Sequence, residues 1–326
     1  MVKIALDAMG GDHAPHEIIK GALSAIKEFP VEIVLVGDPE AIKKHLPHQL
    51  PDRISIFPAS QKIEMNESPA LAVKQKKDAS INIAVKLVKE QKADAIISAG
   101  NTGALMAAAL FGLGRIKGIE RPAIATVFPT PSGKVLLLDM GANVDCKPEN
   151  LKQFALMGAA YAEKVLHIKN PRVGLLNIGE EAEKGNELVV SSYPLLRNLP
   201  INFAGNVESK EIFSDKVDVV VCDGFVGNLI LKFAESVAST IVTLLKKEVK
   251  KTPVTLLGAL MLVPAFKNLK KMVDYDEYGG AQLLGVKGIC FKAHGRARAK
   301  AIKNTIRVAF EAVEGKLVDA LSEVKA

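Results

Sequence analysis

A strand that ends in a short polar turn and leads into a helix is the feature that most constrains the fold of this chain. Residues 135–138 form an uninterrupted apolar run that stops at Asp139, and Gly141 and Asn143 follow it. An apolar run bounded by turn residues is typical of a strand buried on both faces of a parallel sheet. The next residues fit the first turn of a helix with an acidic side chain near its start. Residues 134–154 therefore predict a strand, a glycine-bearing turn and a helix.

The same unit recurs along the chain. Five apolar strands are each predicted to end in Asp, Asn or Ser, with glycine close behind. In open α/β sheets, ligands bind outside the carboxyl ends of the strands. The turns therefore predict a shared rim of backbone N–H groups and short polar side chains, which suits a small anion or a carbonyl oxygen. Ordinary turn chemistry is the alternative, because Gly, Asn and Asp populate such turns anyway. The five turns cover residues 7–12, 98–103, 139–143, 177–181 and 223–228.

These units predict an α/β fold with a doubly wound, mostly parallel sheet, formed by a single domain over residues 1–326. A short Pro- and Gly-containing turn between residues 123–128 and 134–138 predicts one antiparallel hairpin within that sheet. A long helical region is expected over 68–91, and a helical excursion from the sheet over 229–280.

Composition excludes several classes of protein. The 326 residues carry 43 Lys and Arg against 36 Asp and Glu, a formal charge of +7, which suits an acidic partner or an anionic surface. Basic residues are not interleaved with aromatic ones, so a nucleic-acid partner is not expected. Cys146, Cys222 and Cys290 lie far apart, which argues against a disulfide framework or a zinc site and fits a reducing cytosol. No uninterrupted apolar run approaches the roughly 20 residues that span a bilayer, so a cytoplasmic or peripheral protein is expected.

Common catalytic motifs are missing from the sequence. The glycine-rich residues 112–118 follow a predicted helix rather than a strand, so they indicate a helix end and not a dinucleotide site. Neither a phosphate-binding GxxxxGK[ST] loop, nor a zinc-binding HExxH helix, nor a GxSxG nucleophile turn occurs. If the protein is an enzyme, the attacking group is expected to belong to the substrate.

Lys184 and Gly185 form a candidate phosphate site, because they lie near the predicted start of a helix, where backbone N–H groups and the helix dipole favour anions. The alternative is a solvated lysine within the acidic cluster at 180–183. His13 and His294 each adjoin a glycine-bearing turn and are candidate acids or phosphate donors, although a structural role is the alternative for either.

An uncharged segment at 256–266 is flanked on both sides by lysines. It is too short to span a bilayer, and its flanks suit anionic headgroups. A subunit-contact or core helix is the alternative. The flanking lysines are Lys246, Lys247, Lys250, Lys251, Lys267, Lys270 and Lys271.

Eight short motifs are spread over nearly the whole chain: DAMGGD at 7–12, SAGNTGA at 98–104, DMGAN at 139–143, NIG at 177–179, GNVE at 205–208, DGFVGN at 223–228, YGGA at 278–281 and KAHG at 292–295. Together they resemble those of the PlsX family, the bacterial phosphate acyltransferases of phospholipid synthesis. The resemblance implies a fold similar to isopropylmalate dehydrogenases and phosphotransacetylases.

The resemblance also implies a reaction and its partners. A fatty acyl group would pass reversibly from acyl-[acyl-carrier-protein] to inorganic phosphate, giving acyl phosphate for a membrane glycerol-3-phosphate acyltransferase. A homodimer with peripheral membrane attachment is implied, with neither a cofactor nor a metal. The alternatives are a phosphotransacetylase-like enzyme that uses acyl-CoA, a dehydrogenase of the same fold, and a membrane-surface scaffold without enzymatic activity.

For this reaction, we expect catalytic roles for Lys184, Asn228, Asn143 and His13. Lys184 with the Gly185 amide would hold phosphate, and the two asparagines would orient substrate or donate to the oxyanion. The expected substrate-binding residues are Asp7, Gly10, Gly11, Asp12, Ser98, Gly100, Asn101, Thr102, Gly103, Asp139, Gly141, Gly179, Gly185, Asp223, Gly224, Gly227 and His294.

Two basic patches could steer an acidic carrier protein toward the site. A solvated helix face is the alternative for each. The first patch comprises Arg296, Arg298, Lys300 and Lys303, and the second comprises Lys74, Lys76 and Lys77.

Overall fold

The computed structural model describes residues 1–131, 133–266 and 277–323. Within them, eleven strands form one continuous sheet in the order β3-β2-β1-β4-β11-β10-β5-β6-β9-β7-β8. The strands are β1 (Val2–Asp7), β2 (Val31–Gly37), β3 (Ile54–Pro58), β4 (Ala95–Ser98), β5 (Ala123–Thr130), β6 (Gly133–Leu138), β7 (Arg172–Asn177), β8 (Asn202–Glu208), β9 (Val219–Val221), β10 (Ala281–Leu284) and β11 (Ile289–Lys292).

The sheet is mixed but mostly parallel, as the sequence predicted. Strands β3, β2, β1, β4 and β11 run parallel to one another, and so do β6, β9, β7 and β8. Between these two parallel halves, β10 is antiparallel to both β11 and β5, and β5 is antiparallel to β6. The β5–β6 pair confirms the predicted hairpin. Strand β10 was missed, because four residues give too short an alternation to recognise.

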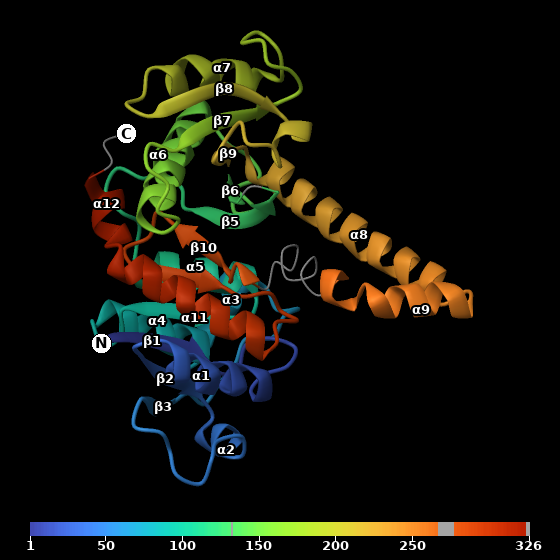
Figure 1. Cartoon of the computed structure of the whole chain (residues 1–326). Helices are drawn as coiled ribbons and strands as arrows, with labels where there is room; N and C mark the ends of the chain where they lie inside the picture. Colours follow the sequence, from blue (N-terminus) through green and yellow to red (C-terminus); the bar gives the residue numbers. More distant parts are fainter. Residues whose placement is uncertain (132, 267–276, 324–326) are drawn as a thin grey trace.

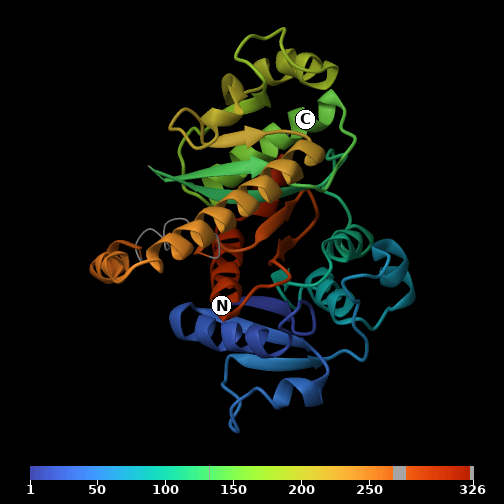
Figure 2. The ribbon, with the colours of Figure 1, turned by 90° about the vertical axis from the view of Figure 1, so that its right-hand side faces the viewer.

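Helices cover both faces of the sheet (Figures 1 and 2). One buried core includes residues of α1, α6, α11 and α12, and the other includes residues of α3, α4 and α5. Both cores exist because the strands of a parallel sheet present apolar side chains on each face. The helices are α1 (His16–Glu28), α2 (Pro39–Lys43), α3 (Pro69–Gln75), α4 (Ser80–Lys89), α5 (Thr102–Gly112), α6 (Pro148–Lys164), α7 (Glu187–Arg197), α8 (Gly224–Val249), α9 (Pro253–Met261), α11 (Ala299–Glu314) and α12 (Leu317–Glu323).

The helical region expected over 68–91 is present, but it consists of two separate helices, α3 and α4. The chain leaves the helical conformation at Lys76, where ψ is 69°. Asn82 then bonds back across the break: its Nδ2 donates to the carbonyl oxygens of Val73 and Lys76 at 2.9 and 2.8 Å. An amide side chain that donates hydrogen bonds to backbone carbonyls at a helix end stabilises that end, so the helix does not continue. The spacing of apolar residues gives no sign of such a bond.

Helices α8 and α9 project from the sheet as a long arm (Figure 1). Their exposed apolar residues include Phe233, 70% exposed, and Met261, 79% exposed. By length and composition alone, α8 could cross a membrane, which corrects the expectation that no segment reaches this length. The segment escaped notice because Lys232 and Glu235 interrupt its apolar sequence. One such helix is weak evidence of a span. Part of the expected excursion, including Lys267, Lys270 and Lys271, lies outside the described residues.

Candidate functional site

The polar turns form two hydrogen-bonded groups, one on each half of the sheet, and the single rim stays a prediction. The reversals through β10 and β5 make β6, β9 and β7 antiparallel to β1, β4 and β11. Carboxyl ends of the two halves therefore start from opposite edges.

The first group joins the turn after β1 to the turn after β4. Asp7 is buried, and its Oδ2 accepts a hydrogen bond from Ser98 Oγ at 2.6 Å. The Ser98 hydroxyl in turn accepts from the Gly100 amide at 3.0 Å. A Cβ on Gly10 would lie 2.7 Å from the Gly100 nitrogen, so only glycine allows this approach. Burial raises the pKa of Asp7, and the hydrogen bonds that it accepts oppose the shift. Asp7 and Ser98 therefore fasten two loops together.

The turn after β11 completes the first group. The amide of Asp12 donates to the Gly295 carbonyl at 2.8 Å, and Gly11 adopts a φ of +104° beside it. Lys292 ends β11 here: its Nζ donates to the carbonyl oxygens of Ala99, at 3.4 Å, and Ala293. Burial lowers the pKa of Lys292 to about 8, although Asp7 and Asp12 oppose the shift. Sequence reasoning quoted Lys292 in the KAHG motif but did not select it as a site residue.

Asn101 links the first group to helix α5. Its Oδ1 accepts from the Ala104 amide at 3.1 Å and caps the helix, while its Nδ2 donates to the Met65 carbonyl. Thr102 is exposed at the first turn, and a Cβ on the following Gly103 would collide with Pro69.

His13 is half-buried in the turn after β1, and His294 is exposed, with Nδ1 accepting from the Arg296 amide at 3.1 Å.

The second group is built around Asp139. This carboxylate is fully buried after β6 and accepts from the amides of Ile124, Ala142 and Asn143 at 2.9, 3.0 and 2.7 Å. The Asn143 Nδ2 donates to Asp139 at 2.8 Å and to the Pro122 carbonyl at 2.7 Å. Burial raises the pKa of Asp139, and these hydrogen bonds counteract it. The side chains of Asp139 and Asn143 thus form their hydrogen bonds within the protein, and they stabilise the conformation of this loop.

Helix α8 starts directly on this loop. Asp223 caps the helix by accepting from the Val226 amide at 3.0 Å, and the Gly224 amide donates to the Asn143 carbonyl at 2.8 Å. A Cβ on Gly227 would lie 1.9 Å from the Asp139 carbonyl oxygen. Asn228 lies beside Gly141, which adopts a φ of +111°. The glycines of the predicted motif therefore let a helix N-terminus sit against the Asp139 turn.

Lys184 and Gly185 lie just before α7, as expected. The Lys184 Nζ forms an ion pair with Glu181 at 2.7 Å, which raises the lysine pKa, and the side chain is half exposed over Gly179. Gly185 adopts a φ of +108°, and the Lys184 carbonyl accepts from Asn177 Nδ2 at 2.8 Å. The amide side chain of Asn177 thus holds this loop against the end of β7.

A cavity of about 640 Å³ connects the α7 start with the α8 start. Polar groups from Asn177, Gly185, Asn186 and Asp223 border it, and Glu208 and Ser209 add to this side. The apolar part of the wall comprises Leu151, Leu176, Ile178, Val189, Val226 and Ile230. Small-molecule sites combine apolar walls with a few placed polar groups in this way. Sequence reasoning had not chosen Asn186, which follows Lys184 and Gly185, or Glu208, the last residue of β8.

The polar side of this cavity combines the N-terminus of α7 with two carboxylates, Asp223 and Glu208, next to the apolar wall. Asn186 caps α7, with Oδ1 accepting from the Val189 amide at 2.9 Å, so the helix N-terminus faces the cavity region. Such an end favours negative charge, and Lys184, outside the lining of the cavity, lies next to Gly185 and pairs with Glu181. Among the residues that the structure describes, no three His, Cys, Asp or Glu side chains cluster as a metal site would require.

Comparison with known proteins shows the family. The model of the fatty acid synthesis protein family matches residues 2–319. The chain is 56% identical to the phosphate acyltransferase of Desulfitobacterium hafniense (strain Y51) and 55% identical to that of Heliobacterium modesticaldum, covering 99% of this chain and 97% of each relative.

Solved structures show the same fold at low identity. The phosphotransacetylase of Streptococcus pyogenes matches with a TM-score of 0.67 at 16% identity, covering 96% of this chain and 94% of that one. A 4-hydroxythreonine-4-phosphate dehydrogenase of Klebsiella pneumoniae matches with a TM-score of 0.55 at 16% identity, covering 96% of this chain and all of that one. This mixed α/β architecture, together with the family match over nearly the whole sequence, places the chain in the PlsX family of phosphate acyltransferase enzymes.

Proposed function

We propose that this enzyme transfers a fatty acyl group reversibly from acyl-[acyl-carrier-protein] to inorganic phosphate, releasing acyl phosphate for phospholipid synthesis. One observation carries the proposal: the cavity of about 640 Å³ has Gly185, Asn186 and the N-terminus of α7 at its polar side and an apolar wall beside them. Phosphate fits the helix N-terminus by its dipole, with Lys184 next to Gly185 in the chain, and a fatty acyl group fits the wall.

The reaction needs no nucleophile from the protein. A phosphate oxygen attacks the thioester carbonyl, a C–O bond forms, and the C–S bond breaks as the tetrahedral intermediate collapses. Starting from hydrogenphosphate, the proton of the nucleophile ends on the departing thiol, so atoms and charge balance without an external acid. The enzyme therefore has to position the two reactants and stabilise the oxyanion.

In this proposal, Lys184 and the Gly185 amide hold phosphate, and Asn228 faces the acyl carbonyl from the first turns of α8. Asn143 acts indirectly, because its amide group is already bonded to Asp139 and the Pro122 carbonyl. Asp139 positions the turn on which Asn228 rests. The loops around Asp7 and His13 lie on the other half of the sheet, and the role of His13 in this proposal is to donate a hydrogen bond to phosphate.

The direct test is to incubate the protein with long-chain acyl-[acyl-carrier-protein] and phosphate. We expect phosphate-dependent release of the thiol and acyl phosphate of matching mass; a reaction without added phosphate is the control. Acyl-CoA is the competing donor. Turnover with acyl-CoA and none with the carrier protein would replace this proposal with the phosphotransacetylase-like alternative. If neither donor loses its thioester, the remaining alternative is a membrane-surface scaffold without enzymatic activity.

The exposed arm of α8 and α9 supports two further parts of the proposal: a homodimer and peripheral attachment of a cytoplasmic enzyme to anionic membrane. Leu257 and Leu260 are 63% and 61% exposed on α9, and four lysines precede it. We expect the protein to float with anionic vesicles and the Leu257→Glu/Leu260→Glu variant not to; Leu50→Glu, on a distant loop, is the control. Equal flotation of all three would contradict the attachment, and a monomer in sedimentation would contradict the dimer.

A further inference from the structure

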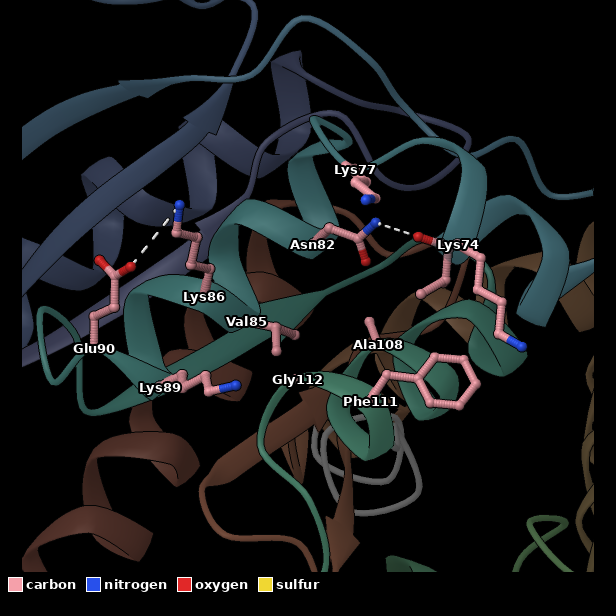
Figure 3. Close-up of a pocket in the computed structure, with 11 residues that line it drawn as sticks. Lys74, Lys77, Asn82, Val85, Lys86, Lys89, Glu90, Ala108, Phe111 and Gly112 are labelled. Carbon is pink, nitrogen blue, oxygen red and sulfur yellow. Dashed lines mark hydrogen bonds and ion pairs between the residues drawn. The ribbon is translucent and has the colours of Figure 1, made fainter.

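Four lysines surround a groove between α3, α4 and α5 (Figure 3). The groove has a volume of about 810 Å³. Lys86 and Lys89 lie on its α4 side, and Lys74 and Lys77 come from the end of α3 and the break after it. Its floor is apolar and comprises Val73, Val85, Ala108 and Phe111. An apolar strip between two rows of cations is the complement of an acidic amphipathic helix.

The broken helix creates this groove. Because Asn82 holds the end of α3 against the start of α4, lysines from both helices face the same hollow. Asn82, Lys86 and Lys89 recur at helical spacing on one face of α4, a stretch of roughly 10 Å at 1.5 Å per residue. That length matches two turns of a partner helix.

Most of this positive charge is not neutralised within the protein. Among the described residues, Lys74, Lys77 and Lys89 form no ion pair with a carboxylate, and the Lys74 Nζ lies 5.3 Å from the Phe111 ring centre. Lys86 is 3.8 Å from Glu90, whose carboxylate is shared with Lys92 at 2.7 Å.

The other basic candidates differ. Lys76 pairs with Glu67 at 2.7 Å, outside the groove. In the first patch, Lys300 pairs with Glu277 at 2.8 Å and Lys303 with Glu28 at 2.9 Å. Carboxylates within the protein partly neutralise these lysines, so the groove has more unpaired positive charge for an acidic partner.

Helix α5 connects the groove with the first group of loops. Its cap, Asn101, belongs to the turn after β4, and Phe111 lies nine residues beyond Thr102 at the opposite end. At 1.5 Å per residue, this separation is roughly 14 Å. A partner docked in the groove would therefore lie at the far end of α5 from the first group of loops.

We propose that this groove docks the acidic acyl carrier protein through one of its helices. The inference rests on the proposed function for the identity of the partner. Acidic side chains of that helix pair with the four lysines, its apolar face covers Phe111 and Val85, and the thioester arm extends toward the loops. Complementary charges of this kind govern partner choice and association rate, and they weaken with salt.

The test compares two charge-reversal variants of equal charge change. Lys86→Glu/Lys89→Glu alters the groove, and Lys27→Glu/Lys44→Glu alters exposed lysines at the ends of α1 and α2, away from the groove. We expect the groove variant to raise the KM for acyl-[acyl-carrier-protein] about tenfold at low salt, with the KM for phosphate unchanged. The control variant should stay within twofold of the wild type. Lys74→Glu/Lys77→Glu should repeat the effect from the other side.

Direct binding separates this inference from the proposed reaction. The Kd of the acyl carrier protein, measured by fluorescence anisotropy, should rise about tenfold in the groove variant even if no acyl phosphate forms. An unchanged Kd and KM in both groove variants would overturn the docking site while leaving the reaction intact. An equal rise in KM for acyl-CoA would also overturn it, because the lysines would then serve a nucleotide donor.

Discussion

Replacing Gly227 by alanine tests whether the contact between α8 and the Asp139 turn sets the geometry of the second group. The new Cβ would lie 1.9 Å from the Asp139 carbonyl oxygen, a backbone atom, and contacts below 3.0 Å essentially do not occur. The separation must therefore grow by about 1.1 Å. Neither atom is at the end of a flexible side chain, so the helix start and the turn have to move apart.

Two effects on stability oppose each other in this variant. Overpacking of this kind typically destabilises by about 1–3 kcal/mol. Alanine within a helix is favoured over glycine by about 1 kcal/mol. We therefore expect a net loss of about 0–2 kcal/mol and a melting temperature only a few degrees lower. Activity should suffer far more, because Asn228 and Asp223 move with the helix, and misplacement of reacting groups by about 1 Å can reduce the rate about 100-fold.

Gly258→Ala provides the matched control, since Gly258 also lies within a helix but has no neighbouring atom within 4 Å of the added Cβ. Turnover of acyl-[acyl-carrier-protein] and thermal unfolding should be measured for both variants. We expect Gly258→Ala to keep full activity and unchanged or slightly higher stability. Wild-type kcat and melting temperature in Gly227→Ala would refute the reasoning, because they would show that α8 and the Asp139 turn separate without consequence.

Three further changes test individual residues. Lys184→Ala should raise the KM for phosphate at least tenfold with little change in melting temperature, since its ion pair is half exposed; an unchanged KM would remove Lys184 from phosphate binding. Asp139→Asn should destabilise by about 2–4 kcal/mol, because its NH2 group cannot accept from the amides that the carboxylate satisfies; denaturant unfolding measures this loss, and a neutral result would contradict it. Burial holds the Lys292 pKa near 8, below its unfolded value of about 10.4, so the unfolded chain binds more protons between these values and stability should rise with pH there. Unfolding free energies at pH 7.5, 9 and 10 should show this rise in the wild type relative to Lys292→Met, and parallel profiles would count against it.

The strands, turns and helices could be predicted from the sequence because each depends on residues that are contiguous in the chain. The apolar run before Asp139 and the glycines after it predict a buried strand and a tight turn, and the structure has both. The hairpin of β5 and β6 was likewise predicted from two strands and a short turn. Lys184 and Gly185 were expected near the start of a helix, and α7 begins two residues after Gly185.

Relations between distant segments could not be predicted in this way. Lys292 acquires its surroundings from loops almost 200 positions earlier, including the Ala99 carbonyl. At the break between α3 and α4, the side chain of Asn82 donates hydrogen bonds to two backbone carbonyl groups. In the sequence, Asn82 is only a polar residue at a position compatible with a helix. The lysine groove exists only because of this break.

The sequence by itself determined the strand–turn–helix units, the polar turns and the positions of Lys184, Gly185 and Asp223, since spacing and residue type act over a few neighbouring positions. Only the tertiary structure decided that the turns form two groups and that Asp139 and Asn143 bond inward. Strand direction is the physical reason for the first, because the reversals at β10 and β5 arise from pairing between remote segments. Burial is the reason that Asp139 and Asn143 bond inward. A carboxylate that is removed from water must accept hydrogen bonds from protein donors, and these come from the loops that fold against it.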